Sequence, residues 1–213
     1  MRRNNPLTVK EAITSLLDYA EKMQSRYVSL FEANHHFLAE DVIADHPVPP
    51  CDRSPYDGFS VRSIDTIQAT TRSPKILQVI GEVAAGDVFN GCVQEREAVR
   101  IMTGAQIPEG CDAVIMQEAV KEIIIEGKTY IHVRRPIEKN RNISFTGEDI
   151  PQGTVLMKRG QYITPGVIAL LATFGYKNVP VCTKPKVGIL VTGSELLDVD
   201  KPLEPGKIRN SNG

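Results

Sequence analysis

The middle of the chain has a hydrophobic pattern of short apolar runs separated by turns that contain glycine. Residues 76–80, 99–102 and 113–116 have the length and composition of buried strands. Residues 120–133 contain two further apolar runs on either side of a glycine-containing turn, which is the pattern of a hairpin. Because short strands with such turns are typical of small barrels and sandwiches, we predict a barrel-like, all-β subdomain over residues 51–146.

Two other stretches have the spacing of helices. After Thr8, apolar residues recur on one helical face up to about residue 23, and Glu11 stands where a capping box requires an acidic side chain. A proline follows Thr164 at the first position of a second helix, and Gly175 is placed to end that helix. The pattern therefore predicts one helix at each of these two places.

The end of the chain carries a different signal. Residues 187–191 are continuously apolar, as in a strand that is covered on both faces. The polar segment 192–196 follows directly, and ligands of open α/β sheets bind outside the carboxyl ends of the strands. A parallel neighbour requires a crossover of a dozen or more residues, and only residues 196–213 remain. We therefore expect residues 182–213 to be the truncated start of an α/β domain, and the chain to be a fragment or a truncated product.

The composition narrows the class of protein. Of the 213 residues, 41% are hydrophobic and 24% are charged, which is ordinary for a globular protein. A net charge of −1 offers no electrostatic attraction to nucleic acid or to a membrane surface. No apolar run approaches the roughly 20 residues of a membrane helix, and no signal peptide is evident, so we expect a cytoplasmic protein. The four cysteines lack metal-binding spacing, which favours free thiols over a zinc site.

Two turns carry candidate chemistry. Thr103 and Gly104 follow a predicted strand, in a loop that either presents N–H and O–H groups to a ligand oxygen or is an ordinary turn capped by its own threonine. Asp57 and Gly58 form a typical turn dipeptide. Asp57 is then either an exposed carboxylate aimed at a metal or a substrate hydroxyl, or the acceptor of a hairpin hydrogen bond.

Charged side chains gather after the last predicted strand of the β subdomain. One group is a basic cluster, made of Arg134, Arg135, Lys139 and Arg141. This cluster is a solvated loop unless an anionic substrate lies nearby. The other group is Glu148 and Asp149, two adjacent carboxylates that either share Mg²⁺, which prefers carboxylate oxygens and water, or belong to a polar turn. No Ser–His or Cys–His nucleophile is evident, which favours chemistry by positioning and electrostatics.

Four ordered motifs suggest a family. They are residues 100–105 followed by 108–110 and 112–114, residues 54–59, residues 147–150 and residues 192–196. In order and spacing they resemble the signatures of the MoeA/gephyrin E-domain family of molybdenum insertases, and the resemblance covers nearly the whole chain. The chain departs from the family pattern around Asp57, where Pro55, Tyr56 and Phe59 replace the usual neighbours, so the packing there is expected to differ.

The resemblance implies a fold and a division into domains. The fold is α+β and multi-domain: an elongated mixed linker domain carries the inserted all-β, barrel-like subdomain and is followed by the start of an α/β molybdopterin-binding domain. The implied parts are an N-terminal helix (1–26), a linker and dimerisation domain (27–50 and 147–181), the β subdomain (51–146) and the molybdopterin-binding segment (182–213).

The resemblance also implies an activity. The family ligates molybdate to adenylylated molybdopterin with release of AMP, using Mg²⁺. Its members act as homodimers, with the active cleft between the β subdomain of one subunit and the third domain of the other. The adenylyl-molybdopterin substrate is expected to be handed over by a molybdopterin adenylyltransferase. The alternative is a non-catalytic dimerisation or scaffold module, as in the gephyrin branch.

Site residues follow from the matched motifs. The resemblance implies catalytic roles for Asp57, Thr103, Asp149 and Glu195. The three acids Asp57, Asp149 and Glu195 are the implied metal ligands. Substrate binding is implied for Gly104, Thr192, Gly193 and Ser194. Because only the first loop of the opposite cleft wall is present, we expect this chain alone not to turn over.

Overall fold

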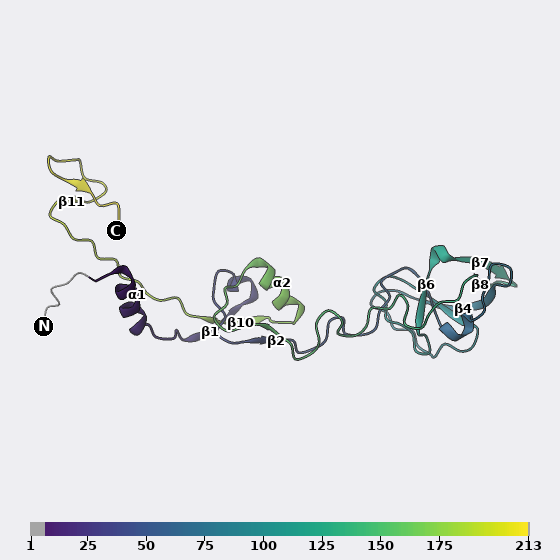
Figure 1. The fold of residues 1–213 in the computed structure, drawn as a ribbon. Coiled ribbons are helices and arrows are strands. Elements are labelled where there is room, and N and C mark those ends of the chain that lie inside the picture. Colours follow the sequence, from purple (N-terminus) through teal and green to yellow (C-terminus); the bar gives the residue numbers. More distant parts are fainter. Residues whose placement is uncertain (1–6, 213) are drawn as a thin grey trace. The chain divides into compact units, whose positions relative to one another are not determined.

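The structure is a computed structural model that describes residues 7–212 (Figure 1). Contacts within the chain divide it into two compact units. One unit is the continuous segment Asp41–Lys158. The other is built from the residues up to Glu40 together with those from Arg159 onward, so the first unit is an insertion in the second.

The insertion is organised around one six-stranded sheet, in the order β6-β3-β5-β4-β8-β7. All neighbouring strands are antiparallel except β4 and β5, which run parallel. The strands are β3 (Gly58–Val61), β4 (Lys75–Val83), β5 (Glu97–Ile101), β6 (Ala113–Met116), β7 (Val120–Ile125) and β8 (Lys128–Val133). Two short 3₁₀ helices accompany them, η2 (Ser63–Thr66) and η3 (Gln117–Ala119). The strands predicted at residues 76–80, 99–102 and 113–116 are therefore confirmed.

Each face of this sheet carries its own hydrophobic core. On β5, Ala98 belongs to one buried cluster, whereas its neighbour Val99 belongs to the other. On β6, Ile115 and Val114 alternate in the same way. Successive side chains of a strand point to opposite faces, so a sheet buried on both faces requires apolar residues at every position. This explains why these strands appear in the sequence as unbroken apolar runs.

The predicted hairpin over residues 120–133 is confirmed as β7 and β8. Ile125 pairs with Lys128, so the loop consists of two residues, Glu126 and Gly127. Both have positive φ angles, 52° and 77°. A two-residue loop with left-handed backbone at both positions matches the twist of the strands that it joins, and glycine adopts that conformation without strain.

A second pair of strands lies within the same unit. Strand β2 (Val42–Ile43) pairs antiparallel with β9 (Val155–Met157), near the two ends of the insertion. Farther inward, Val48 and Ile150 form an isolated antiparallel bridge. The incoming and outgoing segments of the insertion therefore run antiparallel and are paired at both places.

The other unit contains the second predicted helix. Helix α2 (Pro165–Thr173) begins after Thr164, whose hydroxyl accepts a hydrogen bond from the main-chain N–H of Val167, and Gly175 follows its end with a φ angle of 71°. Its Leu171 is fully buried. The helix contacts η1 (Leu30–Ala33), which in turn contacts the antiparallel pair β1 (Ser25–Ser29) and β10 (Asn178–Cys182).

The first predicted helix is present but shorter than expected. Helix α1 (Val9–Asp18) has the complete capping box between Thr8 and Glu11, as predicted. It ends about five residues before residue 23. None of its residues is buried, so its apolar face contacts no core among the described residues.

The predicted strand at residues 187–191 is wrong. These residues have no regular secondary structure, and Val187, Ile189 and Leu190 are 77%, 71% and 89% exposed. A strand requires a neighbour to satisfy its backbone groups, and within residues 7–212 no segment pairs with this one. Instead, β11 (Leu196–Leu197) and β12 (Ile208–Arg209) form a small parallel pair. Among the described residues, no helix has the length and apolar character to cross a membrane.

Candidate functional site

Asp57 and Thr103 are brought together by the pairing of two strands. Asp57 immediately precedes β3, and Thr103 is the second residue after β5. The strands are antiparallel with Gly58 opposite Ile101, so the start of one lies beside the end of the other. Oδ1 of Asp57 accepts hydrogen bonds from both the main-chain N–H and the Oγ1 hydroxyl of Thr103, each at 2.7 Å. Two of the predicted site residues are therefore in direct contact.

These hydrogen bonds stabilise the ionised form of Asp57. The main-chain N–H of Thr103, and next its hydroxyl, lower the pKa of this exposed carboxyl below its ordinary value. Both bonds end on Oδ1, and within the described residues no hydrogen bond engages Oδ2. The carboxylate is thus anchored through Oδ1, and its other oxygen, Oδ2, is open to a cation or to a hydrogen-bond donor.

Gly58 has a different role from the one that its sequence suggested. It opens β3 in the interior of the sheet and is not a turn residue, so the hairpin interpretation of Asp57-Gly58 is wrong. A Cβ atom at Gly58 would lie 2.1 Å from the carbonyl oxygen of Ile115 on the adjacent strand. Glycine is required here because the neighbouring main chain leaves no room for a side chain.

Gly104 holds the loop of Thr103 in place. Its φ angle is 87°, and its N–H donates to the carbonyl oxygen of Ser54 at 2.8 Å. Ser54 in turn donates its N–H to the carbonyl oxygen of Ala105 at 3.0 Å. The amides of Thr103 and Gly104 are thus engaged within the chain, and the substrate-binding role of Gly104 stays a prediction.

Asp149 reaches the same region through Arg53, a residue that the sequence analysis missed. Oδ2 of Asp149 lies 3.9 Å from Nη2 of Arg53, and both side chains are partly exposed. The main chain of Arg53 pairs with Ser144 through two hydrogen bonds of 2.9 Å. Asp149 therefore contacts a residue four positions before Asp57. Among the described residues, Asp149 forms no hydrogen bond or ion pair with Asp57 or Thr103.

Asp52 repeats the arrangement of Asp57. Its Oδ1 accepts from the N–H and the hydroxyl of Thr146, each at 2.8 Å. Thr146 and Thr103 are each followed by a glycine with positive φ. The short segment 52–57 is therefore tied at one end to the loop 146–149 and at the other to the loop 103–105. The recurrence of Thr-Gly in two motifs was the sequence signal for this arrangement.

Glu148 accepts hydrogen bonds within its own loop, and the sharing of Mg²⁺ between Glu148 and Asp149 stays a prediction. Its Oε2 accepts from the N–H of Phe145 at 2.9 Å. The pKa of Glu148 is lowered, first by the hydroxyl of Ser144 and then by this N–H. Across residues 7–212, no group of three or more His, Cys, Asp or Glu side chains converges as a metal site would require. Mg²⁺ commonly binds through one or two carboxylates plus water and substrate phosphate, and the oxygen Oδ2 of Asp57 fits one such position.

The remaining predicted site residues belong to the other compact unit. The segment Thr192–Glu195 is exposed and precedes β11. The carboxylate of Glu195 folds over Gly193, where an added Cβ would lie 2.7 Å from both carboxylate oxygens. The carbonyl oxygen of Ser194 accepts a hydrogen bond from the side chain of Lys207. The roles predicted for Thr192, Gly193, Ser194 and Glu195 stay predictions.

Comparison with known proteins identifies the family. A family model described as the MoeA N-terminal region (domain I and II) matches residues 7–175. The chain belongs to the MoeA family. The resemblance inferred from the four motifs is therefore confirmed, and the Asp57–Thr103 contact is a feature of a MoeA N-terminal region.

The names of similar proteins agree with the assignment of this chain to the MoeA family. The chain is 50% identical over 212 residues to a molybdopterin molybdenumtransferase of Bacillus subtilis, which covers 100% of the chain and 49% of the relative. A molybdopterin molybdenumtransferase of Staphylococcus aureus is 47% identical over 213 residues, covering 100% of the chain and 50% of the relative. The chain thus spans about half the length of the curated relatives that it matches.

Solved structures show the same fold. A crystal structure of the molybdopterin biosynthesis moeA protein from Pyrococcus horikoshii OT3 matches with a TM-score of 0.84 at 43% identity, covering 95% of this chain and 53% of that chain. A second structure from the same species matches with a TM-score of 0.85 at 32% identity, covering 96% and 51%. The described fold, mostly β with few helices, is that of a MoeA N-terminal region.

Proposed function

We propose that this chain supplies the N-terminal part of a molybdopterin molybdenumtransferase, which ligates molybdate to adenylylated molybdopterin with release of AMP. The observation that carries the proposal is the anchored carboxylate of Asp57, with one oxygen held by Thr103 and the other open. Support also comes from the names of relatives that share 43–50% of the sequence. The expectation that this chain alone does not turn over is part of this proposal.

In the proposed mechanism the chain positions groups and supplies charge. Mg²⁺, when bound, would neutralise the phosphate oxygens of the substrate. Asp57 would offer its Oδ2 to that Mg²⁺, and Thr103 keeps the carboxylate ionised and fixed in orientation. Arg53 places a positive charge 3.9 Å from the carboxylate of Asp149 at the neighbouring loop. Fixed charges of this kind lower a barrier without reorganising during the reaction.

The opposite wall of the site is proposed to come from a second subunit. Thr192, Gly193 and Ser194 would contact the substrate, and Glu195 would provide a further carboxylate. The exposed apolar face of α1 supports association, because an amphipathic helix normally buries such a face against a partner. The same face is the observation that favours the alternative function, a dimerisation or scaffold module without catalysis.

A chimaera tests the proposal. This chain is joined to the half of the Bacillus subtilis relative that it does not match, since the matched halves are 50% identical. We expect the chimaera to release AMP from adenylyl-molybdopterin when molybdate and Mg²⁺ are present, and the chain by itself not to do so. Asp57→Asn in the chimaera should lower turnover by about a hundredfold, as loss of one fixed electrostatic group commonly does.

The matched control is Glu126→Gln, which removes an exposed carboxylate from the tip of the β7–β8 hairpin and should leave turnover unchanged. Full activity of the Asp57→Asn chimaera would remove Asp57 from the mechanism. A folded chimaera that binds substrate but never releases AMP would favour the scaffold alternative.

A further inference from the structure

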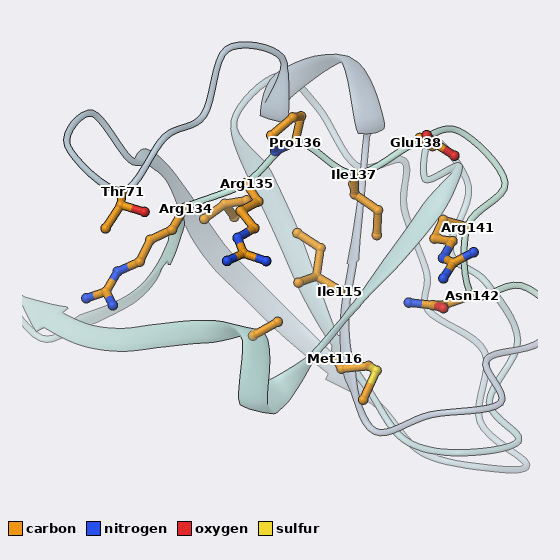
Figure 2. Close-up of a pocket in the computed structure, with 12 residues that line it drawn as sticks. Thr71, Ile115, Met116, Arg134, Arg135, Pro136, Ile137, Glu138, Arg141 and Asn142 are labelled. Carbon is orange, nitrogen blue, oxygen red and sulfur yellow. The ribbon is translucent and has the colours of Figure 1, made fainter.

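A pocket of about 800 Å³ lies on the β unit, between the edge strand β6 and the segment that follows β8 (Figure 2). Ile115 and Met116 of β6 form part of its wall, and Arg134 and Arg135 follow β8 directly. Asp57, Thr103 and Asp149 do not line this pocket. It is therefore separate from the site proposed for the insertase, although Met116 pairs with Gly58 through the main chain.

Three arginines give the pocket a strong positive charge. Arg134, Arg135 and Arg141 line it, against the single carboxylate of Glu138, so the charged lining residues sum to three positive and one negative. All three arginines are exposed, and in the described part of the chain none of them forms an ion pair. By contrast, Arg100 on the same sheet pairs with both Glu82 and Glu122. The positive charge of the pocket is therefore available to a ligand.

The main chain that carries these arginines is held in place. After Arg135, the N–H of Ile137 donates to the hydroxyl of the buried Thr66 at 3.0 Å. The carbonyl oxygen of Arg141 accepts from the N–H of Val114 on β6 at 3.1 Å. Next to it, the side-chain amide of Asn142 donates to the carbonyl oxygen of Val114 at 2.8 Å. Anchoring both ends of the segment reduces the ordering cost that a ligand has to overcome.

The remainder of the pocket surface is apolar. Figure 2 shows Ile115 between Arg135 and Arg141, with Met116 below it and Ile137 above. Ile115 is 6% exposed and Met116 is 38% exposed. A cavity of this size with an apolar floor and a few charged groups fits a small organic ligand. Guanidinium groups recognise phosphate oxygens in particular, because their planar donor pairs match the spacing of those oxygens.

We propose that this pocket binds a small organic phosphate. Its phosphate group is held by the arginines, with Arg135 and Arg141 as the principal donors, and its ring or carbon frame lies on Ile115 and Met116. This site is additional to the proposed insertase function and does not depend on it. A free oxyanion such as inorganic phosphate carries the charge of this ligand but lacks its apolar part. Binding of an organic phosphate can therefore be distinguished from binding of a free anion.

Calorimetric titration of the whole chain tests this inference, with AMP as the probe and with inorganic phosphate and adenosine as its two halves. We expect AMP to bind one site per chain, and phosphate and adenosine each to bind at least tenfold more weakly. Arg135→Gln and Arg141→Gln should each weaken AMP binding about fivefold, and Glu138→Gln should strengthen it, as expected from the loss of one attractive or repulsive charge.

Two control variants establish whether AMP binds in this pocket and not elsewhere on the chain. Arg96→Gln removes an exposed arginine of the same unit that lies outside the pocket, and it should leave AMP binding unchanged. Lys128→Gln removes another exposed positive charge of the same unit outside the pocket, and it should also leave AMP binding unchanged. The inference is overturned if AMP does not saturate, if the double variant of Arg135 and Arg141 binds AMP normally, or if phosphate alone binds as tightly as AMP.

Discussion

At the scale of single residues, the segment 52–57 organises the candidate site. Asp52 and Asp57 each accept two hydrogen bonds from a threonine that is followed by a glycine with positive φ. A carboxylate that accepts an N–H and an O–H on one oxygen keeps its other oxygen free while its orientation is fixed. The two aspartates therefore connect loops that are far apart in the sequence and leave Asp57 ionised.

The pKa of Asp57 provides the first prediction at this scale. The lowered pKa means that the Asp57–Thr103 contact contributes its full stability above the ordinary pKa of an aspartate, about 3.9, and loses it as the pH falls through the lowered value. Thr103→Val should raise the pKa of Asp57 only partly, because the main-chain N–H, the larger cause, remains. Titration of the Asp57 carboxyl carbon by NMR measures this shift.

Thr146→Val is the matched control for that titration, since it removes the equivalent hydroxyl from Asp52 and should not change the pKa of Asp57. An unchanged pKa of Asp57 in Thr103→Val would show that the hydroxyl has no part in holding the carboxylate.

Gly58 provides the second prediction. Gly58→Ala places a Cβ 2.1 Å from the Ile115 carbonyl oxygen, so β3 and β6 have to separate. We expect the free energy of unfolding to fall by about 3 kcal/mol, measured by urea titration. Gly188→Ala is the control, because nothing lies within 4 Å of its added Cβ, and it should change stability by less than about 0.5 kcal/mol. Equal stability of the two variants would contradict the close approach.

At the scale of elements, the two helices differ in what covers them. Helix α2 buries Leu171, whereas Val9, Ile13, Leu16 and Leu17 of α1 are 52–77% exposed. Both helices have good N-caps, so capping alone does not distinguish them. Because the apolar stripe of α1 contacts no core among residues 7–212, we expect it to be covered by association.

Oligomeric state is the prediction for this element. We expect the chain to be a dimer by light scattering, and Leu16→Asp on the exposed stripe of α1 to shift it toward the monomer. Ser15→Asp introduces the same charge on the polar face and should leave the dimer intact. Identical masses for the two variants would place the dimer contact elsewhere, and a monomeric parent chain would contradict the proposed association.

At the scale of the whole molecule, the two compact units differ in continuity. The unit Asp41–Lys158 is one continuous segment with a sheet and two cores, whereas the other unit combines both ends of the chain. Residues 183–193 have no regular secondary structure and carry exposed apolar side chains. Backbone without paired hydrogen bonds is accessible to proteases, while a central strand is not.

Limited proteolysis tests this difference. Trypsin should cleave after Lys186 well before it cleaves after Arg100, which lies within β5 and is half-buried. The bond after Lys184 should resist because a proline follows it. Lys186→Gln should remove the early product, as seen by mass spectrometry of the intact fragments. Early cleavage after Arg100 instead would contradict the described sheet.

Local signals in the sequence determined several features without reference to the fold. The cap of Thr8 and Glu11, the cap at Thr164 and the hairpin over residues 120–133 with its glycine-containing turn were all predicted, because each depends on contacts within a few residues. The ordered motifs determined the family for the same reason, since they are read along the chain. The division into four parts and the roles of the site residues remain predictions.

Only the tertiary structure decided how these pieces meet. The contact between Asp57 and Thr103 joins residues 46 apart and exists because β3 and β5 are neighbours in the sheet. The same sheet turned an expected turn glycine, Gly58, into a close-packing one. Residues 187–191 do not form the predicted strand. An apolar run specifies only a tendency to be buried, and the segment that covers it has to be supplied by the tertiary structure.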